Sequence, residues 1–188
     1  MNVLELIILT GFEPFDNQLR NLSEEIVRSF SNKIGNLLVV KKILPVSWKN
    51  CAKQYRKLVN SLKSPPQLVV LLGIHSDDAY HIEKFGWNIA FGIDRYNCFK
   101  CGPVLAAAKL RMPTLLDVSK IQADLRGFIK IGLSHYGGYF LCNYLYFIAL
   151  KIADQRYPVI FIHIPSNERI SIGIQNIELI INSVKKNQ

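Results

Sequence analysis

The chain alternates runs of consecutive apolar residues with segments in which apolar residues recur every three or four positions. Uninterrupted apolar runs predict strands that are buried on both faces, as in a parallel sheet. Such runs cover residues 3–9, 37–44, 68–72 and 158–164, and a shorter strand is expected through Leu133. The first strand is expected to end at Thr10 and Gly11, because a glycine interrupts the pattern there.

Helical spacing marks the segments between these strands. The sequence Asn-Leu-Ser-Glu at residues 21–24 resembles a capping box and predicts the start of a helix. Further helices are expected near residues 48–62, after Asp117, from about residue 141 to 153, and from Ile170 onwards. The apolar positions expected to share helix faces are Leu22, Ile26, Val27 and Phe30 in the first helix, Trp48, Ala52, Tyr55, Val59 and Leu62 in the second, and Ile121, Leu125, Phe128 and Ile129 in the third.

Strands that alternate with helices and need cover on both faces predict an α/β fold, with a largely parallel sheet between helices. Ligands in such folds bind beyond the carboxyl ends of the strands. Residues 73–113 break the alternation, and we interpret them as a long irregular segment that carries function. The 188 residues contain no repeat and no Pro/Gly/Ser-rich linker, so we expect a single domain over residues 1–188.

Composition and charge argue against several classes of protein. With 49% hydrophobic and 20% charged residues, the chain lies outside the range typical of disordered proteins. The net charge of +9 suits an anionic partner, but lysine and arginine are scattered without a nucleic-acid motif, so we predict no nucleic-acid binding. No apolar stretch reaches the ~18 residues of a membrane span, and residues 1–10 do not resemble a secretory leader. We therefore expect a cytoplasmic protein without membrane association, whose four cysteines are reduced.

Cys142 is the first candidate for chemistry. Two glycines precede it, and the helical apolar positions that follow place its thiol at or just inside a helix N-terminus. The helix dipole and the unpaired backbone N–H groups there favour a thiolate and can hold an oxyanion. The alternative is a structural cysteine, because cysteine is among the residue types most often found in protein interiors.

His163 is the second candidate, as the single polar residue at the end of an apolar strand that Pro165 closes. Its imidazole is expected at the carboxyl edge of the sheet, one helix after Cys142. A histidine in that place can act as the base for a cysteine nucleophile. The alternative is a hydrogen-bonded histidine of the core.

A base of this kind usually needs a third group that holds its ring. The carboxylates of Asp77, Asp78 and Glu83 follow the strand at residues 68–72, and each can face the crevice. The alternative for each is a solvated loop carboxylate. The residues alone do not choose among the three.

Cys98 and Cys101 have the C-x-x-C spacing of zinc and redox sites. There is no second pair of this kind, so further zinc ligands would have to come from Cys51, His75 or His81 without any recognised pattern. A redox pair normally lies at the start of a helix, but the residues after Cys101 do not continue as a helix. We therefore predict no metal and no redox function for this pair.

Residues 11–15 follow the first strand, where a dinucleotide-binding protein carries its glycine-rich phosphate loop, but the required glycines are absent. Two aromatic residues, Phe12 and Phe15, stand there instead. They either pack in the core or line an apolar slot at the crevice.

Four short sequences stand in order along the chain: Thr-Gly-Phe-Glu-Pro-Phe at 10–15, Glu-Lys-Phe-Gly-Trp-Asn at 83–88, Phe-Leu-Cys-Asn at 140–143 and Phe-Ile-His-Ile-Pro at 161–165. Together they resemble the motifs of the pyroglutamyl peptidase I family, also called pyrrolidone-carboxylate peptidases. The resemblance spans nearly the whole chain. It implies a three-layer α/β/α sandwich with a mostly parallel twisted sheet, and self-association as a homodimer or homotetramer.

The resemblance further implies a cysteine peptidase that removes an N-terminal pyroglutamyl residue from peptides through a thioester acyl-enzyme, without metal or cofactor. Cys142 is then the nucleophile, His163 the base and Glu83 the group that orients the base. A neutral lactam ring suits an aromatic slot, since it offers flat apolar faces and one amide edge. The residues expected to bind substrate are Phe12, Phe15, Arg95, Phe140 and Leu141.

The chain departs from the family pattern in two places. Family members commonly carry an arginine about ten residues beyond the glutamate; here that position is Ile93, and the nearest candidate to support the oxyanion is Arg95. The family's Ser-Asn-Thr-Ala-Gly sequence before the nucleophile is replaced by Ser-His-Tyr-Gly-Gly at residues 134–138. Two alternatives therefore stay open: a protein that binds pyroglutamyl peptides without turnover, and a hydrolase of another small cyclic or acyl amide.

Overall fold

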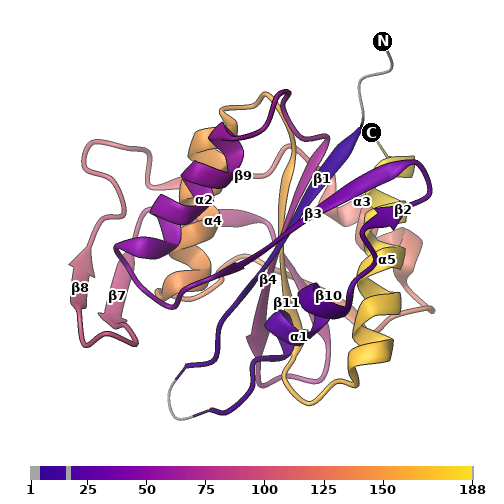
Figure 1. Cartoon of the computed structure of the whole chain (residues 1–188), viewed down its shortest axis with the longest axis horizontal. Coiled ribbons are helices and arrows are strands. Elements are labelled where there is room, and N and C mark those ends of the chain that lie inside the picture. Colours follow the sequence, from indigo (N-terminus) through magenta and orange to yellow (C-terminus); the bar gives the residue numbers. More distant parts are fainter. Residues whose placement is uncertain (1–4, 16–17, 188) are drawn as a thin grey trace.

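A seven-stranded sheet forms the middle layer of the computed structural model, which describes residues 5–15 and 18–187 (Figure 1). The strand order is β10-β5-β11-β4-β1-β3-β2. Neighbouring strands pair in parallel except β2 with β3 and β5 with β11, which confirms the mostly parallel sheet. The strands are β1 (Leu6–Phe12), β2 (Lys33–Ile34), β3 (Leu37–Leu44), β4 (Leu68–His75), β5 (Tyr80–Glu83), β10 (Ile131–Ser134) and β11 (Val159–Pro165).

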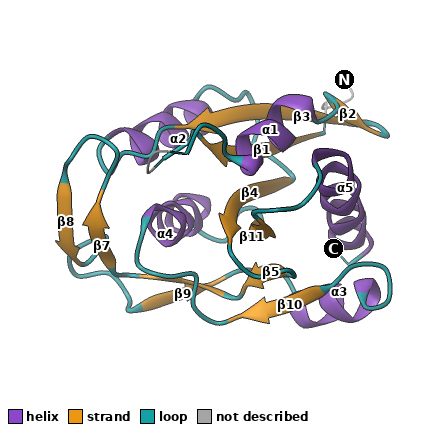
Figure 2. Cartoon of the chain, turned by 90° about the horizontal axis from the view of Figure 1, so that it is seen from below, coloured by secondary structure: helices purple, strands orange, loops and turns teal. Residues whose placement is uncertain are grey.

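Helices cover both faces of this sheet (Figure 2). One face carries α1 (Leu22–Ser29), α3 (Val118–Leu125) and α5 (Ile170–Lys186), and the other carries α2 (Asn50–Asn60) and α4 (Leu141–Ala153). The apolar faces of the two groups enclose two separate buried clusters, one on each side of the sheet. The predicted three-layer sandwich is confirmed. No helix within the described residues combines the length and apolar character needed to cross a membrane.

The turn from β1 to α1 shows how local chemistry sets the element ends. The Asn21 side chain accepts a hydrogen bond from the Ser23 backbone N–H at 3.0 Å, so α1 begins where the capping pattern predicted. The predicted end of the first strand at Thr10 and Gly11 is wrong, because β1 pairs with β3 as far as Phe12. The strand can pass close to α1 because residue 11 is a glycine, since a Cβ there would lie 2.4 Å from the Ser23 carbonyl oxygen. The expected start of this strand at residues 3–4 lies outside the described residues.

Residues 73–113 contain several short strands, so the prediction of one long irregular segment is wrong. They contain the end of β4 and the whole of β5, which joins the main sheet between β10 and β11. They also form two small antiparallel sheets, one from β6 (Phe85–Trp87) and β9 (Arg111–Pro113), the other from β7 (Ala90–Ile93) and β8 (Phe99–Gly102). Strands of three or four residues that contain glycine and polar positions give little periodicity to read.

The third helix is shorter than predicted. It ends at Leu125 and does not include Phe128 or Ile129. Gly127 has a φ of +99°, a conformation that glycine adopts without strain and that ends the helix. Phe128 is 79% exposed and not part of the buried face, whereas Ile129 is buried as expected.

Candidate active site

Three elements bring Glu83, Cys142 and His163 together near the carboxyl ends of β4 and β11. Glu83 is the last residue of β5, His163 lies near the end of β11, and Cys142 is the second residue of α4. β11 runs between β5 and β4, so His163 stands opposite His81 on one side and Gly73 on the other. β5 runs antiparallel to β11, so Glu83 reaches His163 from a strand of opposite direction, and residues far apart in the sequence meet.

The Glu83 carboxylate holds the His163 ring. Glu83 is 2% exposed and His163 8% exposed, and His163 Nδ1 donates to Glu83 Oε1 over 2.7 Å. The hydroxyl of Tyr146 donates to the backbone carbonyl of Glu83 at 3.0 Å, which fixes the end of β5. Because Nδ1 carries the proton given to Glu83, Nε2 is the nitrogen left for the thiol. A Cβ at Gly137 would lie 3.1 Å from Glu83 Cδ, so a larger residue there would press on this carboxylate.

The charge of His163 is set by its two neighbours. Burial alone would lower the pKa of His163, but hydrogen bonding and charge interactions with Cys142 and Glu83 raise this pKa to about 10. The ring is therefore held in its charged form across neutral pH. An imidazolium beside a thiol is the arrangement that favours a thiolate nucleophile.

Cys142 lies at the N-terminus of α4, as predicted. The cap residue Phe140 makes no side-chain hydrogen bond to the helix, and the first backbone N–H groups of a helix have no partner within it. These groups can hold an anion next to the thiol. Gly73 of β4 makes room for the sulfur, since a Cβ at that position would lie 2.9 Å from Cys142 Sγ.

A small apolar pocket opens in front of Cys142. Its wall includes four of the five residues expected to bind substrate, and its remaining members are mostly apolar. Phenylalanine rings in the wall of a small apolar pocket suit a flat ligand. The lining residues are Phe12, Phe15, Asn21, Val46, Gly73, Ile74, Phe140, Leu141 and Cys142.

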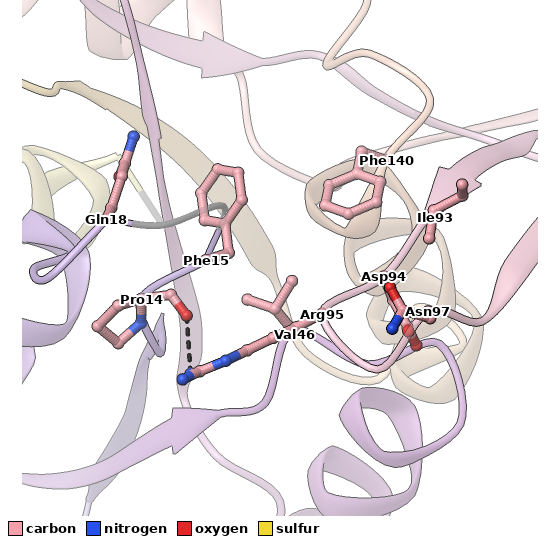
Figure 3. Close-up of a pocket in the computed structure, with 9 residues that line it drawn as sticks. All are labelled: Pro14, Phe15, Gln18, Val46, Ile93, Asp94, Arg95, Asn97 and Phe140. Atoms are coloured by element: carbon pink, nitrogen blue, oxygen red, sulfur yellow. Dashed lines mark hydrogen bonds between the residues drawn. The ribbon is translucent and has the colours of Figure 1, made fainter.

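The fifth residue, Arg95, lies in a wider neighbouring cleft of about 640 Å³ (Figure 3). Phe15 and Phe140 line both spaces, with ring centroids 6.3 Å apart. Arg95 Nη1 donates to the Pro14 carbonyl at 2.9 Å and lies 3.8 Å from a carboxylate oxygen of Glu13. The structure thus places Arg95 at the outer wall of the cleft, and support of an oxyanion by Arg95 stays a prediction.

Sequence reasoning missed Asn143, which follows the candidate nucleophile. Its side chain accepts from the Trp87 backbone N–H at 2.8 Å and donates to the carbonyls of Trp87 and Ile89 at 2.9 and 2.8 Å. These three bonds fasten the segment after Glu83 to the start of α4. The available signal was a buried polar residue on the apolar face of a helix.

Asp94 was also missed. It is 4% exposed, and its carboxylate accepts backbone N–H groups from Trp48 at 2.9 Å and from Tyr96 and Cys98, each also at 2.9 Å. Asp94 therefore ties the β7–β8 connection to the start of the α2 segment and shapes the outer cleft. Its bonds to Tyr96 and Cys98 are local, but the bond to Trp48 joins a segment 46 residues away, which no local pattern reveals.

The other carboxylates and cysteines lie elsewhere. Asp78 pairs with Lys130, and Asp77 lies 3.7 Å from ring nitrogens of both His75 and His81. Cys98 and Cys101 are exposed at the β7–β8 hairpin, and all four cysteines are free. Of the three carboxylates considered, Glu83 is the one in contact with His163.

Comparison with known proteins gives the same family throughout. The family model described as pyroglutamyl peptidase, Peptidase_C15, matches residues 5–184. The pyrrolidone-carboxylate peptidase of Thermococcus litoralis is 30% identical over 172 residues, covering 86% of this chain and 77% of its own. That of Pyrococcus furiosus is 28% identical over 169 residues, covering 85% and 80%. The solved structure of pyrrolidone carboxyl peptidase from Thermococcus litoralis superposes with a TM-score of 0.89 at 25% identity, covering 97% of this chain and 94% of that one.

Proposed function

The chain belongs to the pyroglutamyl peptidase family, and from that premise we propose that it hydrolyses the amide bond after an N-terminal pyroglutamyl residue of peptides. The observation that carries the proposal is the buried Glu83–His163 hydrogen bond beside a thiol at the start of α4. The apolar pocket in front of Cys142 supports the choice of substrate, since a neutral lactam ring needs no charged partner.

In the proposed reaction, the Cys142 thiolate attacks the carbonyl carbon of the pyroglutamyl residue. Backbone N–H groups at the start of α4 stabilise the oxyanion that forms. His163 then gives its proton to the leaving amine, and the C–N bond breaks to leave a thioester on Cys142. No step in this sequence requires a metal or a cofactor.

Hydrolysis of the thioester uses the same groups. His163, now neutral, takes a proton from water, and the resulting hydroxide attacks the thioester carbonyl. The C–S bond breaks, free pyroglutamate leaves, and the thiolate–imidazolium pair is restored. Glu83 keeps Nδ1 protonated throughout, so Nε2 is the atom that moves the proton.

The residues proposed to bind substrate fall into two groups. Phe12, Phe15, Phe140 and Leu141 enclose the pyroglutamyl ring, because they line the pocket at Cys142. Arg95 acts on the outer part of the substrate, because it lines the wider cleft. We regard residues 1–188 as one peptidase domain; the match to the family over residues 5–184 supports this.

We also propose a cytoplasmic homodimer or homotetramer. Four free cysteines fit a reducing compartment. The β7–β8 hairpin exposes Phe91, Ile93 and Phe99 by 53%, 61% and 63%, and such apolar clusters suit contact with a second copy. Sedimentation equilibrium tests this; a monomer at all concentrations would contradict it.

The substrate proposal is tested with three amides of one fluorescent amine, which carry a pyroglutamyl, a prolyl or a glutaminyl group. Proline keeps the five-membered ring without the lactam carbonyl, and glutamine keeps the amide without the ring. We expect kcat/KM for the pyroglutamyl amide to exceed the other two by at least about 100-fold. Equal hydrolysis of the prolyl amide would contradict the assignment. Thermal stabilisation by pyroglutamate without any hydrolysis would instead indicate a binding protein.

A further inference from the structure

Three potential metal ligands converge beside the proposed active site. His75 ends β4, His81 lies in β5, and Asp77 stands in the turn between them. One ligand atom from each lies within 4.8 Å of the other two. Asp77 Oδ2 is 3.7 Å from His75 Nδ1 and 3.7 Å from His81 Nε2, and the two rings are 4.5 Å apart between centroids. The proposed peptidase mechanism uses none of these side chains.

The spacing is too long for hydrogen bonds and suits an ion between the donors. An N–H···O bond spans about 2.7–3.2 Å, so the Asp77 carboxylate bonds directly to neither ring. Donors that bind Zn²⁺ tetrahedrally at about 2.0–2.2 Å lie roughly 3.3 Å from one another. Asp77 Oδ2 is therefore within a few tenths of an ångström of that spacing from each of the two ring nitrogens, and the three ligand atoms all lie within 4.8 Å of one another.

One ring nitrogen of His75, Nδ1, is left free to bind an ion. His75 Nε2 lies 2.7 Å from the Ala79 carbonyl oxygen, which only accepts, so Nε2 carries the proton. Nδ1, the nitrogen that faces Asp77, is then unprotonated and able to bind a metal. A carbonyl that fixes the tautomer of a metal-binding histidine is a common outer-shell feature of metal sites.

His81 also has room to act as a ligand. Its ring lies over Gly132 of β10, where a Cβ would come within 3.3 Å of His81 Cδ2. Its backbone is held on both sides, since β5 pairs with β10 at Gly132 and with β11 at His163. Two of the three ligands are thus placed by the main sheet.

We propose that His75, Asp77 and His81 form a binding site for a late first-row divalent cation such as Zn²⁺. Two imidazoles and one carboxylate suit Zn²⁺, whereas Mg²⁺ and Ca²⁺ prefer oxygen ligands alone. A bound ion joins the end of β4 to the start of β5 next to β11, where the ring of His75 lies 5.7 Å from that of His163. The fourth position is left to water.

The experiment measures Zn²⁺ binding by titration calorimetry in the full chain. A background carrying Cys98→Ser, Cys101→Ser and Cys142→Ala removes the exposed thiols and the proposed nucleophile, so the outcome does not depend on peptidase activity. We expect one Zn²⁺ per chain in the wild type and in this background. Co²⁺ in the same background is expected to give visible d–d absorption without a thiolate charge-transfer band.

Substitutions assign the ligands. Asp77→Asn, at an exposed turn position, and His81→Asn are each expected to weaken Zn²⁺ binding in the background at least about tenfold. His135→Asn is the matched control, because His135 is exposed, packs near Phe85 and lies outside the cluster. Circular dichroism of each variant checks that it is folded.

Saturating Zn²⁺ is also expected to raise the Tm of the background by about 5 °C at a hundredfold excess over Kd. His135→Asn is expected to keep this shift, and Asp77→Asn to lose it. Absence of saturable Zn²⁺ binding in the background, or affinity unchanged by both Asp77→Asn and His81→Asn, would overturn the proposal.

Discussion

The Glu83–His163 pair and the outer cleft around Arg95 both carry charge, but the pair is largely buried and the cleft is open to solvent. The side chains of Glu83 and His163 are 3% and 10% exposed, whereas that of Arg95 is 49% exposed. Charge interactions are strong where water is excluded and are screened at the surface. We therefore expect the buried pair to determine the rate of the chemical steps and the outer cleft to adjust substrate binding.

His163→Gln is expected to give the largest effect on the buried side of this comparison. It removes the group that gives and takes the proton, so kcat/KM for a pyroglutamyl amide should fall at least about 1,000-fold. Steady-state hydrolysis measures this, and thermal unfolding checks the fold. A loss below tenfold in a folded variant would show that another group acts as the base.

Glu83→Gln is expected to cost about 100-fold in kcat, because a neutral amide no longer stabilises the imidazolium. The Gln side chain has a similar volume, so the pocket should stay filled. The KM of a pyroglutamyl amide should change by less than about threefold, since Glu83 does not line the substrate pocket. An equal loss in Asp78→Asn, whose carboxylate pairs with Lys130, would contradict the assignment.

The pH dependence tests the same contact. The pKa of His163 is raised from 6.5 to about 10, so the stability that its charged form adds is complete below pH 6.5 and is lost as pH rises through about 10. The alkaline limb of kcat/KM should also fall near pH 10. Glu83→Gln should move this limb to lower pH, whereas a limb that stays in place would show that His163 does not titrate there.

Gly73→Ala probes the space beside the thiol. The added Cβ would lie 2.9 Å from Cys142 Sγ and 3.0 Å from two ring atoms of Phe161, so the sulfur must shift. We expect kcat/KM to fall by ~30-fold, which is less than the ~100-fold loss typical of a 1 Å displacement of a reacting group. We also expect the free energy of unfolding to fall by ~1–3 kcal/mol, because the added methyl group overpacks the core. Gly132→Ala is the control, since its Cβ would meet only the ring of His81. Equal activity losses in the two variants would rule out a specific role for this space.

Arg95→Ala is expected to give the smallest effect, on the solvent side of the comparison. Its guanidinium is bound to the Pro14 carbonyl, so KM should rise by less than about tenfold with kcat nearly unchanged. Arg95→Lys keeps the charge, so its KM should lie between those of the wild type and Arg95→Ala. A drop in kcat of about 100-fold would instead place Arg95 at the oxyanion.

The apolar layers of this fold could be predicted from sequence, whereas the site could be predicted only in part. α4 was predicted at its observed bounds and β11 within one residue, because long buried elements carry strong periodicity. The small strands β5 to β9 were missed, since each has only three or four residues and most of them contain glycine or polar positions. Phe128 was misplaced because Gly127 ends the helix first.

The choice of Glu83 over Asp77 and Asp78 illustrates the same limit. All three carboxylates follow β4, and the contact with His163 arises only when β5 pairs with β11. The sequence shows the candidates but not that register. Asn143 was missed for the same reason, as was the contact of Asp94 with Trp48, because each joins segments far apart along the chain.

The central claim is that the thiol beside the buried pair performs the hydrolysis. Release of a fluorescent amine from a pyroglutamyl amide, measured on wild type and Cys142→Ala in parallel, tests it most directly. We expect turnover by the wild type and a fall in kcat of at least about 1,000-fold in a folded Cys142→Ala variant. Comparable turnover by both proteins would contradict the account.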